Sequence, residues 1–235
     1  NMLRYAGFSA SAANVEHEGM LPDQLELALQ KGARAVILTP RAHNPTGCSL
    51  SASRAAQLQE ILARYPQTLV IVDDHFALLS ACHWYPVIAK ETTHWAIVRS
   101  MSKTLGPDLR LAIVASDPLT SGKLRLRLNS GSQWVSHLLQ DLACACLSDE
   151  TYQHTLAQTQ QFYTAQQQTL AAALRRHGIE MPVGDGLNMW LPLEDDSQAI
   201  AFALAKSGWL VREGEVFGVN TPAHGLRITL STLTD

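Results

Sequence analysis

Apolar residues gather in short continuous runs along the first half of the chain, and this pattern predicts buried strands. The runs are rich in β-branched side chains and do not alternate with polar ones, which favours strands covered on both faces of a largely parallel sheet. We therefore expect strands at 35–38, 68–72, 95–98 and 111–114.

A helix is predicted between the first two of these strands. The apolar positions from 58 to 65 follow the i, i+3, i+4 and i+7 spacing of an amphipathic helix, and Ser51 or Ser53 can cap its first turn. A strand, a helix and a second strand in this order form a βαβ unit, so the pattern indicates an α/β protein. The same criteria place further helices at 22–31, 118–128 and 133–147.

The texture of the sequence changes after residue 148. A segment rich in Gln and Ala runs without Gly or Pro to Arg176, and regularly placed apolar residues favour an ordered helix over a low-complexity tract. Glycines and prolines follow, together with apolar runs at 187–191 and 226–230 that predict strands. We expect a large domain over 1–148 and a small α+β domain over 149–235.

Composition narrows the class of protein. The chain is 46% hydrophobic and 17% charged, and its net charge of −3 offers no basic surface for nucleic acid. The four cysteines lack the spacing of a zinc site or of a disulfide scaffold, so reduced thiols in a cytoplasmic protein are expected. No apolar run reaches 18 residues and no signal-peptide pattern begins the chain, so neither membrane insertion nor export is expected.

Polar motifs directly follow the first two predicted strands. Residues 39–47 read Thr-Pro-Arg-Ala-His-Asn-Pro-Thr-Gly, which taken alone can be only a turn. Residues 73–75 read Asp-Asp-His, which can bind a divalent metal with help from His43 or His83, or can simply cap a helix. Because the carboxyl ends of parallel strands line one edge of a sheet, both motifs are expected at the same cleft.

A third motif follows the next predicted strand and reads Ser-Met-Ser-Lys-Thr-Leu-Gly-Pro-Asp-Leu-Arg over residues 100–110. Most lysines are solvated surface charges, and Lys103 can be one of them. However, Ser100, Ser102 and Arg110 surround this amine with groups that bind phosphate. An aldehyde cofactor with a phosphate tail requires this combination.

The three motifs, in this order and spacing, resemble those of the pyridoxal 5'-phosphate (PLP) enzymes of the aminotransferase class I/II group. The resemblance implies the aspartate aminotransferase-like fold of type I, with a mostly parallel large domain and a small α+β domain. It implies that Lys103 is the catalytic residue, holding PLP as a Schiff base, and that Asp73 pairs with the protonated pyridine nitrogen. A buried carboxylate at that position keeps the ring able to accept electrons. Asn44 is then expected to bind the ring oxygen O3'.

The same resemblance assigns the anion-binding groups. Ser100, Ser102 and Arg110 are expected to hold the cofactor phosphate. Arg227, in the late Gly-Leu-Arg-Ile-Thr run, matches the arginine that clamps the α-carboxylate of a substrate or effector. Arginine suits both tasks because its planar fork donates paired, charge-assisted hydrogen bonds. The alternative for Arg227 is a plain surface position on a strand.

Finer details resemble the MocR branch of the GntR-type transcription regulators. They are the Lys-to-Arg separation of seven, the Asp-Asp-His motif in place of Asp-Asp-Tyr, and residues 134–140. This branch implies a homodimeric effector domain that senses PLP or an amino compound, and a winged helix-turn-helix that binds DNA. We expect both that helix-turn-helix and the N-terminal part of the PLP domain to lie outside this chain. His75 replaces the tyrosine that normally contacts O3', and because imidazole titrates near neutrality, transamination is in question.

Two other functions remain open on the sequence. The first is a working aminotransferase that runs both half-reactions through Lys103 as the proton-transfer base. The second, more remote, is a metal-dependent hydrolase built on residues 73–75. The PLP hypotheses involve no metal.

Overall fold

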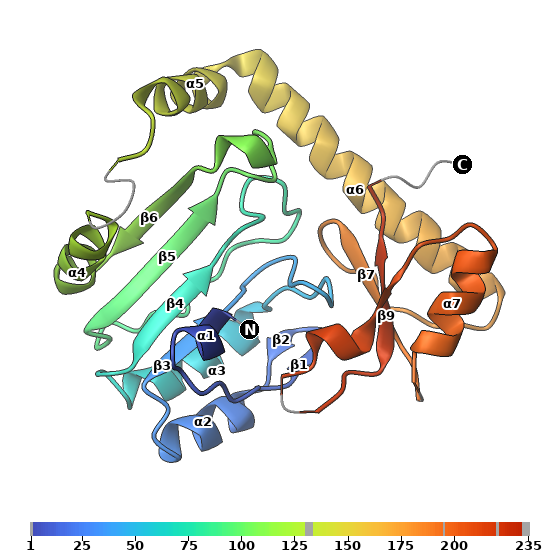
Figure 1. Ribbon diagram of the computed structural model, residues 1–235, viewed down its shortest axis with the longest axis horizontal. Helices are drawn as coiled ribbons and strands as arrows, with labels where there is room; N and C mark the ends of the chain where they lie inside the picture. The colour runs from blue at the N-terminus through green and yellow to red at the C-terminus, as the bar shows by residue number, and fades with distance from the viewer. Residues whose placement is uncertain (1, 130–133, 195, 220, 232–235) are drawn as a thin grey trace.

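The protein is built around two sheets that one long helix connects (Figure 1). The computed structural model describes residues 2–129, 134–194, 196–219 and 221–231. A two-stranded antiparallel hairpin, β1 (Val15–Glu16) and β2 (Gly19–Met20), precedes the larger sheet. Among the residues described, we find no helix with the length and apolar character needed to cross a bilayer.

The larger sheet has the strand order β3-β4-β5-β6. Its strands are β3 (Ala35–Leu38), β4 (Leu69–Asp73), β5 (His94–Ser100) and β6 (Ala112–Ser116). The first three are parallel and β6 is antiparallel to β5. All four lie at the predicted runs to within a few residues, so the predicted α/β class with a largely parallel sheet is confirmed.

Two helices cover one face of this sheet. They are α2 (Pro22–Gln30) and α3 (Ala52–Ala63), and their apolar side chains form one buried cluster with β3 and β4. Ser51 caps α3 as predicted, because its Oγ accepts a hydrogen bond from the Arg54 amide at 3.1 Å. Each fully buried leucine in such a cluster contributes about 1.5–3 kcal/mol to stability.

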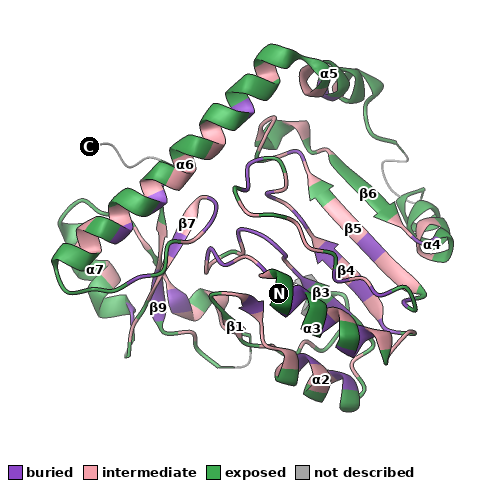
Figure 2. Ribbon diagram, turned by 180° about the vertical axis from the view of Figure 1, so that it is seen from behind, coloured by how far each residue is buried: buried purple, intermediate pink, exposed green. Residues whose placement is uncertain are grey.

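The prediction that the strands are covered on both faces is wrong for the described residues. Along β3, Val36 and Leu38 are buried whereas Ile37 is 48% exposed, because α2 and α3 pack against the same face. Strand β6 is exposed along most of its length (Figure 2). Beyond it lie α4 (Pro118–Leu128) and α5 (His137–Ser148), and residue 133, where we expected α5 to begin, is outside the described residues.

The second half of the chain forms the smaller sheet, which is antiparallel with the order β7-β9-β8. The long helix α6 (Glu150–Arg176) leads into β7 (Asn188–Pro192), and β9 (Gly225–Thr229) pairs with it. These three elements were predicted. The sequence did not indicate α7 (Gln198–Lys206) or the two-residue strand β8 (Arg212–Glu213).

Helix α6 packs against both the larger half of the molecule, which contains the sheet β3-β4-β5-β6, and the smaller half, which contains the sheet β7-β9-β8. Near its start Leu156 joins a cluster with Ala42 and Phe76 of the larger half, and further along Ala171 joins a cluster of the smaller half. Its glutamines include Gln167, which is fully buried, so the segment is an ordered helix as predicted. The remaining elements are α1 (Met2–Tyr5) and two 3₁₀ turns, η1 (Pro107–Leu109) and η2 (Gly214–Phe217).

Candidate functional site

The carboxyl ends of β3, β4 and β5 meet at one edge of the larger sheet and border a cavity. The cavity has a volume of about 400 Å³ and receives side chains from the smaller sheet as well. Five predicted site residues line it, namely Asn44, Asp73, His75, Lys103 and Arg227. The other lining residues were not predicted from the sequence to belong to a site. They are Thr39, Ala42, Phe76, Leu187, Asn188 and Thr229.

Asp73 and Lys103 reach this cavity from neighbouring strands. Asp73 is the last residue of β4, and its half-exposed carboxylate lies 4.0 Å from Nδ1 of His75. Lys103 lies in the turn that follows β5, where the Leu105 amide donates to the carbonyl of Met101 at 2.8 Å. The phenol of Tyr152 on α6 donates to the carbonyl of Thr104 at 2.6 Å. The lysine loop, which is the turn of residues 101–105 that carries Lys103, is thereby held between the larger sheet and α6.

Arg227 links the two halves of the site. From β9 its Nη1 donates to Oδ1 of Asn44, which lies in the loop after β3, at 3.2 Å. Its guanidinium carbon lies 5.3 Å from the ring centre of Phe217, and its Nε is buried without a hydrogen-bond acceptor. Burial and the nearby charge of Arg212 lower the pKa of Arg227. A buried donor without a partner is costly, and a guanidinium pairs well with carboxylates and phosphates, which is chemically consistent with an anion site here.

The three predicted phosphate ligands are not among the residues that line the cavity. Oγ of Ser100 accepts a hydrogen bond from the Ser102 amide at 3.2 Å, which fixes the start of the lysine loop. Arg110 is exposed and adopts the left-handed backbone conformation, with φ of 49°, after the η1 turn. Their phosphate-binding role stays a prediction.

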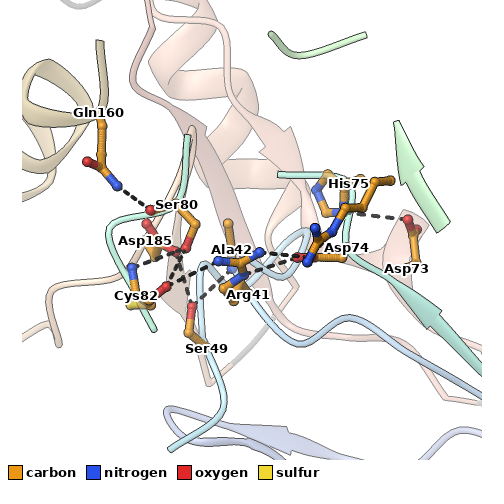
Figure 3. A network of polar contacts seen from close by, with 11 residues as sticks. Arg41, Ala42, Ser49, Asp73, Asp74, His75, Ser80, Cys82, Gln160 and Asp185 are labelled. Carbon is orange, nitrogen blue, oxygen red and sulfur yellow. Dashed lines mark hydrogen bonds and ion pairs between the residues drawn. The ribbon is translucent and has the colours of Figure 1, made fainter. Parts of the chain in front are cut away.

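Next in sequence to residues that line the cavity lies a buried ion-pair cluster, which was not predicted (Figure 3). Asp74 is fully buried, and its two carboxylate oxygens accept from Nε and Nη2 of Arg41 at 3.0 and 2.7 Å. Arg99 donates its Nε to the same carboxylate at 3.0 Å. The sequence contained one signal for this cluster, namely charged residues next to strands predicted to be buried. Charged side chains are rarely buried unless they are paired, so such residues indicate an ion pair.

This cluster argues against the metal-hydrolase alternative. Asp74 is committed to two arginines, so the Asp-Asp-His motif does not present both of its carboxylates to a common ligand. Within the described ranges, no three His, Cys, Asp or Glu side chains lie close enough together to hold a metal ion.

The loop of residues 39–47 also contacts the smaller half of the molecule. Asp185 accepts from the Ala81 amide at 3.1 Å, from Ser49 at 3.3 Å, and from the hydroxyl of Ser80 (Figure 3). Gly47 has φ of 68°, and a Cβ at this position would lie only 2.6 Å from the carbonyl oxygen of Asn188. Glycine is therefore required there both by backbone conformation and by space.

His43 lies in the same loop in the neutral state. Its Nδ1 is 2.8 Å from Oγ1 of Thr46. Burial, and to a smaller degree the charge of His75, lowers the pKa of His43 from 6.5 to about 4. The loop beside Asn44 thus carries no histidine charge at neutral pH.

The cavity fits PLP in size, and its lining residues fit the chemistry of the aldehyde and the ring. Its volume falls within the range of small-molecule sites, which is about 300–1,000 Å³. It combines an amine for the aldehyde, Lys103, with a carboxylate for the ring nitrogen, Asp73. Asn44 and His75 add hydrogen-bonding groups, and Arg227 adds an unpaired cationic donor.

The fold and the site together define an aminotransferase-type PLP domain, and comparison with known proteins agrees. The family Aminotransferase class I and II matches residues 1–235, so the chain belongs to this family. Membership of the family implies PLP as the cofactor.

Among curated proteins, the chain is 73% identical over 235 residues to the "Vitamin B6 salvage pathway transcriptional repressor PtsJ" of Salmonella typhimurium strain LT2. The alignment covers all of this chain and 55% of that protein. An HTH-type transcriptional regulator of Bacillus subtilis, YdfD, is 28% identical over 92% of this chain and 47% of its own length. The chain therefore spans about half the length of both relatives. The resemblance to a family of transcription regulators, drawn from the motifs, is confirmed by these relatives.

Solved structures support the fold. The α-aminoadipate aminotransferase LysN of Thermus thermophilus, complexed with N-(5'-phosphopyridoxyl)-L-leucine, matches with a TM-score of 0.80 and 23% identity. The match covers 94% of this chain and 60% of that structure. The predicted fold of type I is thereby confirmed.

Proposed function

We propose that this chain is the PLP-binding effector part of a MocR-type transcription regulator, with the cofactor attached through the ε-amine of Lys103. The observation that carries the proposal is that one cavity is lined by Lys103, Asp73, Asn44 and Arg227. The whole of this chain also aligns, at 73% identity, with part of a transcriptional repressor. A regulator needs the cofactor chemistry only for recognition, so such a site can persist without a catalytic cycle.

Each residue has a task that follows from its chemistry. When bound, PLP supplies an aldehyde that reacts with amines and a ring that accepts electrons. Asp73 holds the proton of the ring nitrogen, since a carboxylate raises the pKa of an adjacent cationic acid. Asn44 and His75 orient the ring through its oxygen. Ser100, Ser102 and Arg110 bind the phosphate in this proposal.

The sensed molecule is PLP itself or an amino compound that reaches it. Arg227 is the group that would bind the carboxylate of such a compound, through guanidinium donors not taken by Asn44. A ligand anion on these donors would draw the guanidinium toward itself and weaken its hydrogen bond to Asn44. Ligand binding would thereby be transmitted from the smaller sheet to the loop after β3.

DNA would be bound by a winged helix-turn-helix in a part of the protein outside this chain. The net charge of −3 gives this part no general attraction to DNA. We further propose that the protein is a homodimer and acts in the cytoplasm, where its four free cysteines stay reduced.

A working aminotransferase is the second candidate. It is favoured by the same grouping of an amine, a carboxylate and a carboxylate-binding arginine, which is what transamination of an amino acid requires. The residue at position 75 separates the two candidates, because an imidazole stands where aminotransferases of this family normally bring a tyrosine to the ring oxygen.

DNA binding by the full-length protein tests the proposal. We expect PLP to change the dissociation constant for a DNA duplex, selected by the full-length protein from a random-sequence library, at least fivefold, as measured by fluorescence anisotropy. In Lys103→Ala the effect of PLP should be lost, and in the control Lys90→Ala, an exposed lysine that does not line the cavity, it should persist. Indifference of DNA binding to PLP in the wild type, together with turnover of an amino acid and a 2-oxo acid, would instead establish the aminotransferase.

A further inference from the structure

Arg227 is paired across the smaller sheet with a second arginine. Strands β8 and β9 place Arg212 directly opposite Arg227, and the other neighbour of Arg227, on β7, is Trp190. Directly opposed residues of an antiparallel pair project from the same face of the sheet. The face that carries Arg227 to the cavity therefore also carries Arg212.

Two like charges in this position oppose each other. Directly opposed like charges destabilise a sheet, and burial together with the smaller effect of the Arg212 charge lowers the pKa of Arg227. Neither arginine forms an ion pair with a carboxylate in the described part of the chain. The repulsion is thus left uncompensated by the residues around it.

The two guanidinium groups of Arg212 and Arg227 have donors that no described residue occupies. Phe217 packs against the guanidinium of Arg227 and against Trp190, whose ring centre is 6.1 Å from its own. Asn44 occupies Nη1 of Arg227, whereas Nε is buried without a partner. Arg212 is exposed at the neighbouring position. An anion on Arg227 alone would leave Arg212, the residue directly opposite on β8, without a partner among the described residues.

We propose that the amino ligand of this site carries a second anionic group, a carboxylate or a phosphate, which Arg212 binds while Arg227 holds the first carboxylate. This inference rests on the proposed function, since it specifies the ligand class of the same cavity. A ligand with two anions neutralises both arginines and turns their repulsion into two charge-assisted contacts. A ligand with a single carboxylate leaves Arg212 unsatisfied.

The test compares matched ligands on the full-length, PLP-loaded protein. L-Glutamate against L-glutamine, and O-phospho-L-serine against L-serine, differ mainly in the second anion. Dissociation constants come from the change in cofactor absorbance on titration. Wild type should bind the anionic member of a pair about tenfold more tightly or better, as one charge-assisted contact allows. The pair with the larger ratio identifies carboxylate or phosphate as the second group.

The variants Arg212→Gln and Arg176→Gln complete the design. In Arg212→Gln the ratio of the two dissociation constants within a ligand pair should fall to about one, while the affinity for the neutral ligand is retained. Arg176 is an exposed arginine at the end of α6, and in Arg176→Gln the ratio should stay at the wild-type value. A ratio of one in the wild type, or a ratio that Arg212→Gln leaves unchanged, overturns the inference alone. If wild type binds neither member of either pair although it holds PLP, the sensing of amino compounds in the proposed function fails as well.

Discussion

Asp73 and Asp74 are adjacent in the chain and have opposite environments. Successive side chains at a strand end point in opposite directions, so one carboxylate reaches the cavity and the other is directed into the protein. Asp73 is half-exposed and free to meet a ring nitrogen, whereas Asp74 is fully buried between two arginines. One residue of register thus separates the carboxylate proposed to bind the cofactor, Asp73, from the carboxylate of a structural ion pair, Asp74.

Among the residues that line the cavity, those that belong to a sequence motif were predicted and those outside any motif were not. Asn44, Asp73 and Lys103 each lie in a motif at a strand end, where the order of parallel strands brings them together. Asn188 and Thr229 line the same cavity from the smaller sheet. Nothing in their local sequence marks them, since their place depends on how two distant sheets pack.

His43 gives a pH dependence that belongs to the residue scale. Its pKa in the folded state is about 4 and lies below the ordinary 6.5, so the unfolded chain binds the proton more readily. The free energy of unfolding should therefore fall as the pH drops from about 6.5 toward 4, by up to about 3 kcal/mol. Urea denaturation of the full-length protein at pH 7 and pH 5 measures this loss.

The matched variant is His43→Gln, which keeps a polar group near Thr46 and does not titrate. Its loss of stability between pH 7 and pH 5 should be smaller than that of the wild type. Equal losses in both proteins would show that His43 is protonated as easily in the folded state as in the unfolded one.

At the scale of elements, the ion-pair cluster ties the loop after β3 to the loop after β4. Asp74→Ala leaves Arg41 buried without a counter-charge, and breaking a buried pair in this way costs about 3–5 kcal/mol. Arg99→Ala removes a partner whose side chain is 44% exposed, so it should cost about 1 kcal/mol or less. Urea unfolding of the two full-length variants gives both values, and similar losses from both would contradict the assigned roles.

The elements themselves were largely predictable from periodicity. Continuous apolar runs gave β3, β4 and β5, and the absence of Gly and Pro gave the length of α6. Periodicity carries no information about strand direction or about which face of a strand is covered, so the antiparallel β6 and the open face at Ile37 were not anticipated. Strand β8 has only two residues and leaves no pattern, and its position is fixed by pairing with β9.

At the scale of the whole molecule, the cavity exists only where the two sheets meet. Helix α6 spans both halves, and the loop of residues 39–47 is held against the smaller half by the hydrogen bond from the Asp185 amide to the carbonyl of Gly47, at 2.7 Å. The hydrogen bond from Arg227 to Asn44 crosses the same junction. A ligand that changes this bond therefore acts on the contact between the halves, which is the kind of rearrangement that a regulator can transmit.

The proposed function depends on Lys103, because its amine is the group proposed to bind the cofactor. The most direct measurement is borohydride reduction of the PLP-loaded full-length protein, followed by peptide mass mapping. The assignment of Lys103 predicts a pyridoxyl group on this residue, and no adduct or visible absorbance near 410–430 nm in Lys103→Ala, where a reduced lysine adduct can no longer form. A pyridoxyl group on Lys31, Lys90 or Lys123 of the wild type would contradict it.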